Sequence, residues 1–367
     1  MPLVFLDKGN KMKIKIRGFI THKQGETYSN CADNYDFAHI KDKNIFRVAI
    51  SDGVTQSLLP QKWSELLVAN YVSEDNLSKD ISKIAEEAQK KWLVDFHAYV
   101  QKQLASGQIN SVIEQQINQG YACATLAGLE FKYSTDKNEW QWSSELLGDS
   151  VIIYQQDNED NDGKFSVKVE TSVKQQDNKY EFDNYPNYFI GRDRIYKDGK
   201  YQDLRKSNGT PQEKKSQRLT NGTFLLITDA LAEYYLNYLK ITDMKDPISQ
   251  IIENDQDSFL NNIEKLRAEG KLKDDDTTII CLEISEVEKD ELDSEGDLMH
   301  LTELTKKNTE NTGTSHEIKK FKFEKDKSKN TSINNKKFEK DKSKNTSKNN
   351  KKFGKCCKLN FKTIYSK

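Results

Sequence analysis

Residues 46–72 read FRVAISDGVTQSLLPQKWSELLVANYV, and this segment carries a clear sign of the chain's architecture. It opens with a largely apolar run that predicts a buried strand ending at Ser51. An acid and a glycine follow, and helical apolar spacing begins near Lys62. Asp52 therefore lies directly after the C-terminal end of a predicted strand. A glycine directly after the acid lets the backbone turn sharply, so the Gly53 carbonyl can approach a cation held by the carboxylate.

Four further acidic motifs share this setting, because each lies at the edge of a run with strand-like alternation. They are residues 33–36 (DNYD), 147–150 (LGDS), 226–231 (LITDAL) and 273–279 (KDDDTTI). Each alone has an ordinary explanation, as a helix N-cap, a tight turn or a solvated loop. On one shared rim, however, carboxylates repel one another unless a cation compensates. Carboxylate oxygens suit Mg²⁺ and Mn²⁺, and the cysteines and histidines show no zinc-ligand spacing.

The region up to about residue 290 alternates between strand-like and helix-like patterns. Strands are predicted at residues 12–20, 44–51, 122–133, 139–147, 151–154, 165–171, 223–228 and 277–284. Helices are predicted at residues 62–72, about 79–105 and 229–240, with two more after Pro247. Residues 174–218 are polar and poorly periodic, which predicts an irregular surface insertion. The pattern favours an α+β domain in which helices cover a sheet-based core.

Six short strings carry a resemblance to a known family. In chain order they are NYDF, SDGV, ATLAGL, LGDS, ITDAL and DDDTTII, between about residues 14 and 284. This series resembles the signature of protein phosphatase 2C domains, and the tryptophan-containing helix after SDGV is similar to bacterial members. The resemblance implies a four-layer α-β-β-α sandwich of two antiparallel sheets flanked by helices. It also implies a metal-dependent phosphatase that hydrolyses phosphoserine or phosphothreonine.

The same resemblance assigns metal ligands. They would be Asp36, Asp52, Gly53 through its carbonyl, Asp149, Asp229 and Asp275. Asp52 would bridge two Mn²⁺ or Mg²⁺ ions, and Asp149 would contribute to a third, weaker site. A water between the two ions would attack the phosphorus in line, while the ions neutralise charge on the phosphoryl oxygens.

Two positions depart from the family pattern. Tyr35 stands where members often carry Glu, so Asp33 or Asn34 is expected to take over that carboxylate's place. Cys31 stands where members carry the Arg that clamps the substrate phosphate. The basic residues near the end of the first predicted strand are the candidates to replace it: Arg17, His22 and Lys23. His22 is also a candidate general acid for the leaving alkoxide, although an exposed loop histidine is an equal alternative.

These departures leave other functions open. One alternative is a catalytically weak or inactive phosphatase-fold module that binds phosphorylated partners. Another is a nucleic-acid adaptor that works through its C-terminal part. From residue 301 onward there are 20 Lys and no Arg against 7 acidic residues, a net charge of +13. The total of −1 therefore leaves −14 for residues 1–300, and this acidity argues against broad nucleic-acid contact.

The C-terminal part repeats itself with a period of 15 residues. FEKDKSKNTSINNKK from Phe323 is followed by FEKDKSKNTSKNNKK from Phe338. One aromatic residue per repeat cannot offset the entropy of ordering the chain, so residues 291–367 are predicted to be a disordered basic tail. The tail could bind an acidic partner, but a solvated low-complexity segment without a partner is favoured.

Location and partners are inferred from the same composition. Five scattered cysteines form no disulfide framework, and the run Leu3–Leu6 is too short for a signal sequence or membrane span. These features predict a cytoplasmic protein. We expect a monomer whose partners are a phosphoprotein substrate and a serine/threonine kinase.

Overall fold

The computed structural model describes residues 3–7, 12–107, 111–157, 165–177, 179–182, 186–197, 200–213, 216–238 and 255–287. The chain divides into two compact units, residues 1–315 and 316–367, and every described residue lies in the first. The repeat segment and the domain boundary near residue 290 lie outside the described residues, so both remain predictions. Within the described ranges, no helix is long and apolar enough to cross a membrane.

The first large sheet, sheet A, has six antiparallel strands in the order β1-β2-β18-β17-β8-β9. Their bounds are β1 Leu3–Asp7, β2 Met12–Thr21, β18 Thr277–Glu286, β17 Gly222–Ile227, β8 Val151–Asp157 and β9 Phe165–Glu170. Ile227 at the end of β17 pairs with Val151 at the start of β8 and with Ile279 near the start of β18. Thr21 at the end of β2 pairs with Thr277. These four strands therefore have paired termini at the same end of sheet A.

The second large sheet, sheet B, follows the order β15-β7-β6-β4-β3, and a sixth strand, β16, also pairs with β7. Their bounds are β15 Gln212–Glu213, β7 Glu139–Leu147, β6 Leu126–Ser134, β4 Ile45–Ser51, β3 Asn34–Ile40 and β16 Gln217–Arg218. The start of β3 pairs with the end of β4, through Asn34 and Ser51. The start of β6 pairs with the end of β7, through Leu126 and Leu147.

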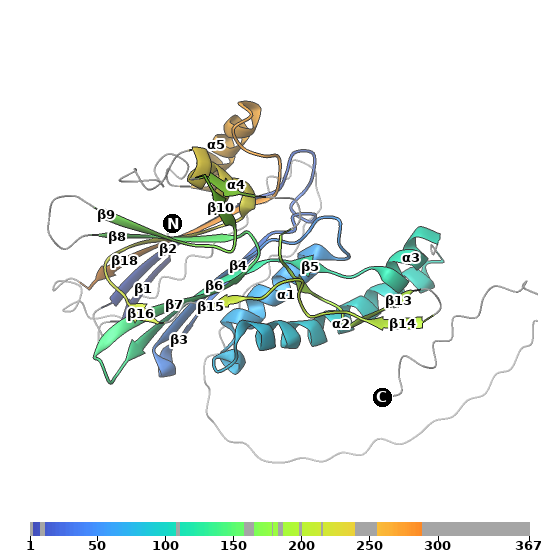
Figure 1. The fold of residues 1–367 in the computed structure, drawn as a ribbon, viewed down its shortest axis with the longest axis horizontal. Coiled ribbons are helices and arrows are strands. Elements are labelled where there is room, and N and C mark those ends of the chain that lie inside the picture. Colours follow the sequence, from blue (N-terminus) through green and yellow to red (C-terminus); the bar gives the residue numbers. More distant parts are fainter. Residues whose placement is uncertain are drawn as a thin grey trace, which may run out of the picture. The chain divides into compact units, whose positions relative to one another are not determined.

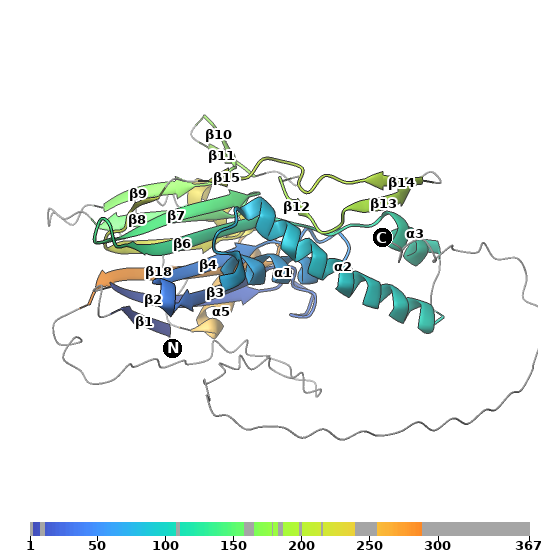
Figure 2. The same ribbon diagram turned by 90° about the horizontal axis from the view of Figure 1, so that it is seen from below.

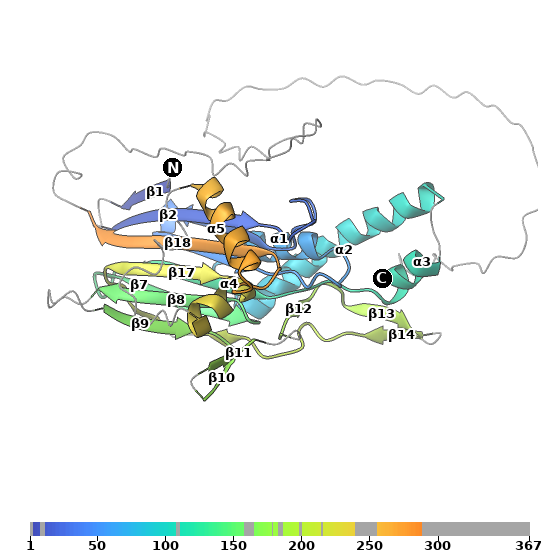
Figure 3. The same cartoon turned by 90° about the horizontal axis from the view of Figure 1, so that it is seen from above.

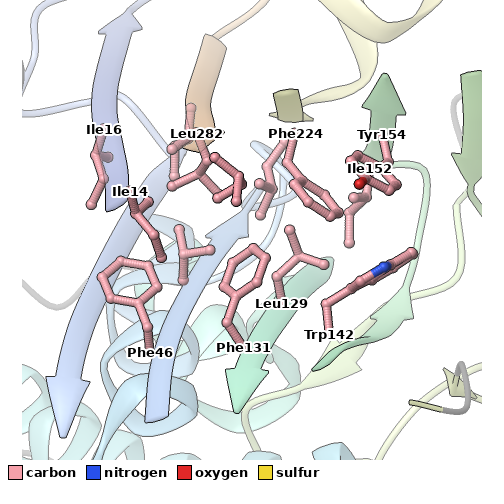
Figure 4. Packing of buried hydrophobic residues seen from close by; sticks show 14 of the residues in the cluster. Ile14, Ile16, Phe46, Leu129, Phe131, Trp142, Ile152, Tyr154, Phe224 and Leu282 are labelled. Atoms are coloured by element: carbon pink, nitrogen blue, oxygen red, sulfur yellow. The ribbon is translucent and has the colours of Figure 1, made fainter. Parts of the chain in front are cut away.

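An apolar core fills the space between the two sheets (Figure 4). The inward-facing residues alternate along each strand, as sheet periodicity requires. Phe224 of β17 stacks on Tyr154 of β8 with ring centroids 4.0 Å apart, and Trp142 of β7 meets Phe224 edge-on at 5.1 Å. Phe46 and Phe131 extend this aromatic cluster along sheet B. Truncating a side chain buried in this way typically costs about 3–5 kcal/mol of stability.

Helices cover the outer face of each sheet (Figures 1, 2 and 3). On sheet B, α1 (Pro60–Val72) and α2 (Ile81–Ala105) bury an apolar cluster that includes Trp63 and Trp92. On sheet A, α4 (Asp229–Glu233) and α5 (Gln256–Ala268) bury another that includes Phe259 and Ile263. The molecule thus has the layers helix, sheet, sheet, helix. The predicted α+β fold, a four-layer sandwich of two antiparallel sheets, is confirmed.

Several elements differ from the sequence-based expectation. The insertion expected to be irregular contains the short strands β10 (Lys174–Gln176), β11 (Lys179–Glu181), β12 (Phe189–Ile190), β13 (Arg194–Lys197) and β14 (Lys200–Asp203). Most of them are exposed on both faces, so they lack the alternation that reveals a half-buried strand. The helix predicted from residue 229 becomes a π-helical turn, η3, at Tyr234–Tyr238. Helix α3 (Ser111–Gln119) was not expected.

A buried glutamate beside α2 gives the fold a pH dependence. Glu145 of β7 accepts a hydrogen bond of 3.0 Å from the Ile81 amide at the start of α2. Burial raises the pKa of Glu145 to about 7, and the charge of Glu213 adds to this effect. Because the pKa of Glu145 is higher in the folded state than the ordinary 4.5, its contribution to stability is fully present below about pH 4.5 and is lost as the pH rises through 7.

Glu145→Gln is therefore expected to stabilise the protein at pH 8 by about 2 kcal/mol, because the amide keeps an acceptor for Ile81 without a buried charge. Denaturant unfolding at pH 8 and pH 5 measures the effect, which should be smaller at pH 5. Glu74→Gln, at an exposed position, is the matched control and should change little. A Glu145→Gln protein less stable than wild type at pH 8 would show that the carboxylate is needed by the fold.

Candidate functional site

Both sheets present aspartates at the same end of the sandwich. The turn from β7 to β8 joins the two sheets there. The paired ends of β2, β18, β17 and β8 in sheet A therefore lie beside the paired ends of β7, β6, β4 and β3 in sheet B. The aspartates at this end, which we call the rim aspartates, are Asp33 before β3, Asp52 after β4, Asp149 between β7 and β8, Asp229 after β17 and Asp275 before β18. The predicted convergence of carboxylates on one rim thus has a structural basis in strand register.

Asp52 is held at the centre of this group by its backbone. The Asp52 amide donates to the Thr125 hydroxyl at 3.1 Å, and the Thr125 amide donates to the Asp52 carbonyl at 2.8 Å. The next residue, Gly53, packs so closely that a Cβ would lie 2.8 Å from the Pro60 carbonyl oxygen and 2.9 Å from that of Ala32. Only glycine fits between these backbones, which explains the residue after the acid.

Asp33 connects the two sheets. Its Oδ2 accepts hydrogen bonds from the hydroxyls of Thr228, at 3.0 Å, and Thr278, at 2.8 Å. Thr228 directly follows β17, and Thr278 is the second residue of β18. The residue is only 1% exposed, and its Oδ1 is buried without a hydrogen-bond partner. A buried carboxylate oxygen left in this way carries a large desolvation cost unless a cation neutralises it.

Asp149 is placed by an unusual turn. Gly148 has a φ of +114°, and a Cβ there would lie 2.4 Å from the Thr125 side chain, so glycine is required on both counts. Asp149 itself is 6% exposed. Thr125 also shares a hydrogen bond of 2.9 Å with the Ser150 hydroxyl, so one threonine contacts the residues around both Asp52 and Asp149. Thr125 was not predicted as a site residue.

The rim aspartates act on one another electrostatically. Loss of hydration, followed by the charges of Asp33, Asp229, Asp149 and Asp275, raises the pKa of Asp52 well above its ordinary value. Loss of hydration and the charge of Asp275 raise the pKa of Asp229 to about 6. The pKa of Asp275 is also raised, mainly by loss of hydration. A group of carboxylates that repel in this way favours either protons or a cation between them.

The two aspartates beside Asp275 have a structural task. Asp276 accepts hydrogen bonds from the amides of Ala32, at 2.7 Å, and Lys23, at 3.0 Å. Asp274 accepts from the Gln24 amide at 2.8 Å. The acidic turn before β18 therefore holds both ends of the loop between β2 and β3 through Asp274 and Asp276. Of its three aspartates, Asp275 is the one that belongs to the rim.

The structure does not bring Asp36 to the rim aspartates. Asp36 pairs with Ala49 inside the β3–β4 ladder, whereas Asn34 pairs with Ser51 next to Asp52. At about 3.3 Å per residue, Asp36 is roughly 10 Å further along the strand than Asp33. Its pKa is raised to about 6 by burial, with a contribution from Glu65 of α1, so it faces the helix layer. Strand register thus makes Asp33 the acid that reaches the rim from β3.

The predicted phosphate-binding residues are placed differently from each other. Arg17 lies four positions before the end of β2 and forms an ion pair with Glu283, so the structure does not bring it to the rim. Lys23 does reach the rim, since its Nζ is 3.2 Å from the Thr55 hydroxyl and its charge lowers the pKa of Asp275. A second cation, Lys273, acts on Asp229 and Asp149 and pairs with Glu233 at 2.8 Å; it was not predicted.

His22 lies beside Lys23 in a pocket of about 420 Å³ between the β2–β3 loop and α5. Its ring meets that of Tyr28 edge-on at 4.8 Å. Its Nδ1 is 2.9 Å from the Lys23 carbonyl oxygen. Because a carbonyl can only accept, Nδ1 carries a proton and donates it to this oxygen, while Nε2 is the other ring nitrogen.

The rim fits a hard cation by chemistry. Its donors are carboxylate oxygens whose charges repel one another, the ammonium groups of Lys23 and Lys273 balance them only in part, and Asp33 holds a buried oxygen without a hydrogen bond. Among the described residues, however, no group of three or more His, Cys, Asp or Glu side chains is arranged so that it could hold a metal ion. Ions at this rim would therefore have to draw the carboxylates inward or keep water among their ligands, as Mg²⁺ usually does.

Comparison with known proteins gives remote similarity. No protein-family model and no curated protein matches the sequence. The solved structures that it resembles include serine/threonine phosphatases of the 2C type. The phosphatase 2C of Toxoplasma gondii is 11% identical with a TM-score of 0.42, and Stp1 of Staphylococcus aureus is 11% identical with a TM-score of 0.41; each match covers 78% of this chain and 98% of the other.

A structure of RsbX in complex with magnesium is 15% identical, with a TM-score of 0.38, and the match covers 78% of this chain and 100% of that one. At such identities and TM-scores the similarity assigns no role to any residue. The function proposed below rests on the rim aspartates and on the groups beside them.

Proposed function

We propose that the chain is a metal-dependent protein serine/threonine phosphatase of the 2C kind. The observation that carries this proposal is the gathering of five aspartates from both sheets at one end, with Asp52 among four other carboxylates. Repulsion among these carboxylates lowers the stability of the folded state, so the arrangement is best explained by cations that bind between them. Hydrolysis of phosphomonoesters is the chemistry that two cations on a carboxylate rim support best.

The rim aspartates, together with the Gly53 carbonyl, would hold two Mg²⁺ or Mn²⁺ ions, and Asp149 would serve a third. Bound cations would supply a nucleophilic water at neutral pH and neutralise charge on the phosphoryl oxygens. The chain's own groups do the rest. Lys23 places an ammonium at the rim that can bind a phosphate oxygen. His22 can hold a proton at Nε2 for the leaving alkoxide, while the Lys23 carbonyl orients its ring.

The test is hydrolysis of a phosphothreonine peptide and of p-nitrophenyl phosphate by the full chain. We expect turnover with Mn²⁺ or Mg²⁺ and a loss to background when EDTA is added, with recovery when the metal is restored. Release of inorganic phosphate is the measurement. Turnover that persists in EDTA, or a chain that binds neither metal in calorimetry, would rule out the proposal.

A second candidate is the inactive module that binds phosphorylated partners. Two observations favour it: the described residues contain no closed metal-ligand set, and Arg17 is engaged with Glu283 away from the rim. Such a module would bind a phosphothreonine peptide without releasing phosphate under any metal condition. The same assay therefore separates the two functions.

The remaining assignments belong to this proposal. A phosphoprotein substrate, a partner kinase, a monomeric state, a cytoplasmic location and a catalytic domain ending near residue 290 remain predictions. The basic segment from residue 301 onward, with its repeats from Phe323, is outside the proposed catalytic domain.

A further inference from the structure

A buried arginine of α5 connects two parts of the site. Arg267 has a side chain that is 4% exposed. Its Nη1 donates to the His22 carbonyl oxygen at 3.1 Å. Its Nη2 donates to the Asp275 carbonyl oxygen and, at 3.2 Å, to the Thr277 hydroxyl. One guanidinium group thus holds the main chain of a rim aspartate and that of the candidate acid.

The two segments that Arg267 joins are 245 and 8 residues away from it in sequence. The first begins the loop between β2 and β3, and the second is the acidic turn before β18. Side chains of the acidic turn already hold the loop through the amides of Lys23 and Gln24. Arg267 adds a further link between the loop and the turn, through the carbonyl oxygens of His22 and Asp275. Its Nε lies 3.7 Å from Asp274 Oδ1, which partly balances the negative charge of the turn.

We propose that Arg267 is a positioning residue, which sets the Asp275 turn and the His22 loop in their working arrangement for cation binding at the rim. This inference rests on the proposed function. Arg267 acts through the backbone of the residues that it holds. The expected consequence of disturbing it is weaker cation binding, because outer partners that orient metal ligands typically contribute about 10- to 100-fold in affinity.

Only an arginine suits this position. The planar fork directs separate N–H groups at the two segments, whereas the single ammonium of a lysine cannot span both with the same geometry. The charge also matters, because a neutral side chain would leave the carbonyl oxygens and the acidic turn without their buried cation. Arg267→Lys keeps the charge and loses the fork, so it separates these two contributions.

The experiment compares the full-length wild type with Arg267→Lys and Arg267→Gln. Arg47→Lys is the matched control, because Arg47 is also 4% exposed and also donates to backbone carbonyls, those of Tyr71, Asn76 and Leu77, on the far side of sheet B. Mn²⁺ affinity is measured by calorimetry. Backbone hydrogen exchange of residues 22–24 and 274–277 is measured without metal, and circular dichroism checks that each variant is folded.

We expect Arg267→Lys to bind Mn²⁺ about 10-fold more weakly and to exchange faster in both segments. Arg47→Lys should lose thermal stability yet keep wild-type Mn²⁺ affinity and wild-type exchange in these segments. Wild-type affinity and exchange in a folded Arg267→Lys protein would overturn the inference, as would an equal loss of affinity in Arg47→Lys. If Arg267→Gln does not fold, Arg267→Lys alone decides.

The same data separate this inference from the proposed function. A wild type that binds no Mn²⁺ would defeat the proposed phosphatase, and the hydrogen exchange of Arg267→Lys would then still decide whether Arg267 sets the two segments. A wild type that binds Mn²⁺ with no difference in Arg267→Lys would defeat the inference and leave the phosphatase standing.

Discussion

Replacing Asp52 by Asn is expected to lower kcat/KM for a phosphothreonine peptide by about 1000-fold. That factor corresponds to ~4 kcal/mol of transition-state stabilisation, in the range of a preorganised electrostatic group at an active site. Asp52 is the rim aspartate on which the charges of four others act, so the variant removes the carboxylate at the centre of the group. The Thr125 hydrogen bonds to the Asp52 backbone remain, so the local structure is kept.

The same variant should gain stability in the absence of metal. The pKa of Asp52 is raised in the folded state, so its ionised form opposes folding at every pH above its ordinary value. A neutral Asn removes this repulsion, and the metal-free variant at pH 8 should unfold at a higher temperature than the wild type. Added Mn²⁺ should raise the unfolding temperature of the wild type and not that of the variant.

The predicted loss of activity and the predicted gain of metal-free stability go in opposite directions, which separates loss of a cation ligand from misfolding. A misfolded variant would lose activity and stability together, whereas loss of a cation ligand removes activity and raises metal-free stability. Asp136→Asn, in the exposed β6–β7 turn, is the matched control and should leave both unchanged. Wild-type turnover by Asp52→Asn would exclude Asp52 from the reaction and, with it, the proposed centre.

The fold was largely predictable because its strands face a core on one side. In β7 the buried residues Trp140, Trp142 and Ser144 alternate with half-exposed ones, and sequence analysis detects this period of two. All eight predicted strand segments contain strands. Most of the small strands between residues 174 and 218 were missed because pairing alone, without a buried face, leaves no periodic signal, and the buried β12 is only two residues long.

The site was predictable to the extent that its residues follow strand ends. Asp52, Asp149, Asp229 and Asp275 all do, and the structure brings them together. Arg267 could not be found in this way, since it lies within a helix whose sequence reads as an ordinary amphipathic surface segment. Its partners become neighbours only when α5 packs on sheet A.

Which of Asp33 and Asp36 reaches the rim could not be predicted from the sequence. The motif DNYD contains both acids, and a family-based spacing favours Asp36, but strand pairing decides which one reaches the rim. A shift along β3 also changes the face that a side chain occupies, because neighbouring residues point to opposite sides of the sheet. Asn34, on the same face as Asp36, donates to the Ser64 hydroxyl of α1 at 2.8 Å, so that face belongs to the helix layer.

Asp33→Asn is therefore expected to reduce kcat/KM by about 100-fold, whereas Asp36→Asn should stay within about 3-fold of the wild type. The two variants make the same chemical change on one strand. Asn at 33 keeps an oxygen for the hydroxyls of Thr228 and Thr278, and Asn at 36 keeps one for the Phe37 amide. Neither substitution therefore removes a hydrogen bond that the fold needs, and the difference reports on charge at the rim.

Phosphate release at several Mn²⁺ concentrations is the measurement, because weakened cation binding raises the metal concentration needed for half-maximal activity. Asp33→Asn should need more Mn²⁺ than the wild type, and Asp36→Asn should need the same. The reverse result, a large loss in Asp36→Asn with little change in Asp33→Asn, would mean that the β3–β4 register in the working enzyme differs from the one described. It would return the first metal ligand to the position that the family motif assigns.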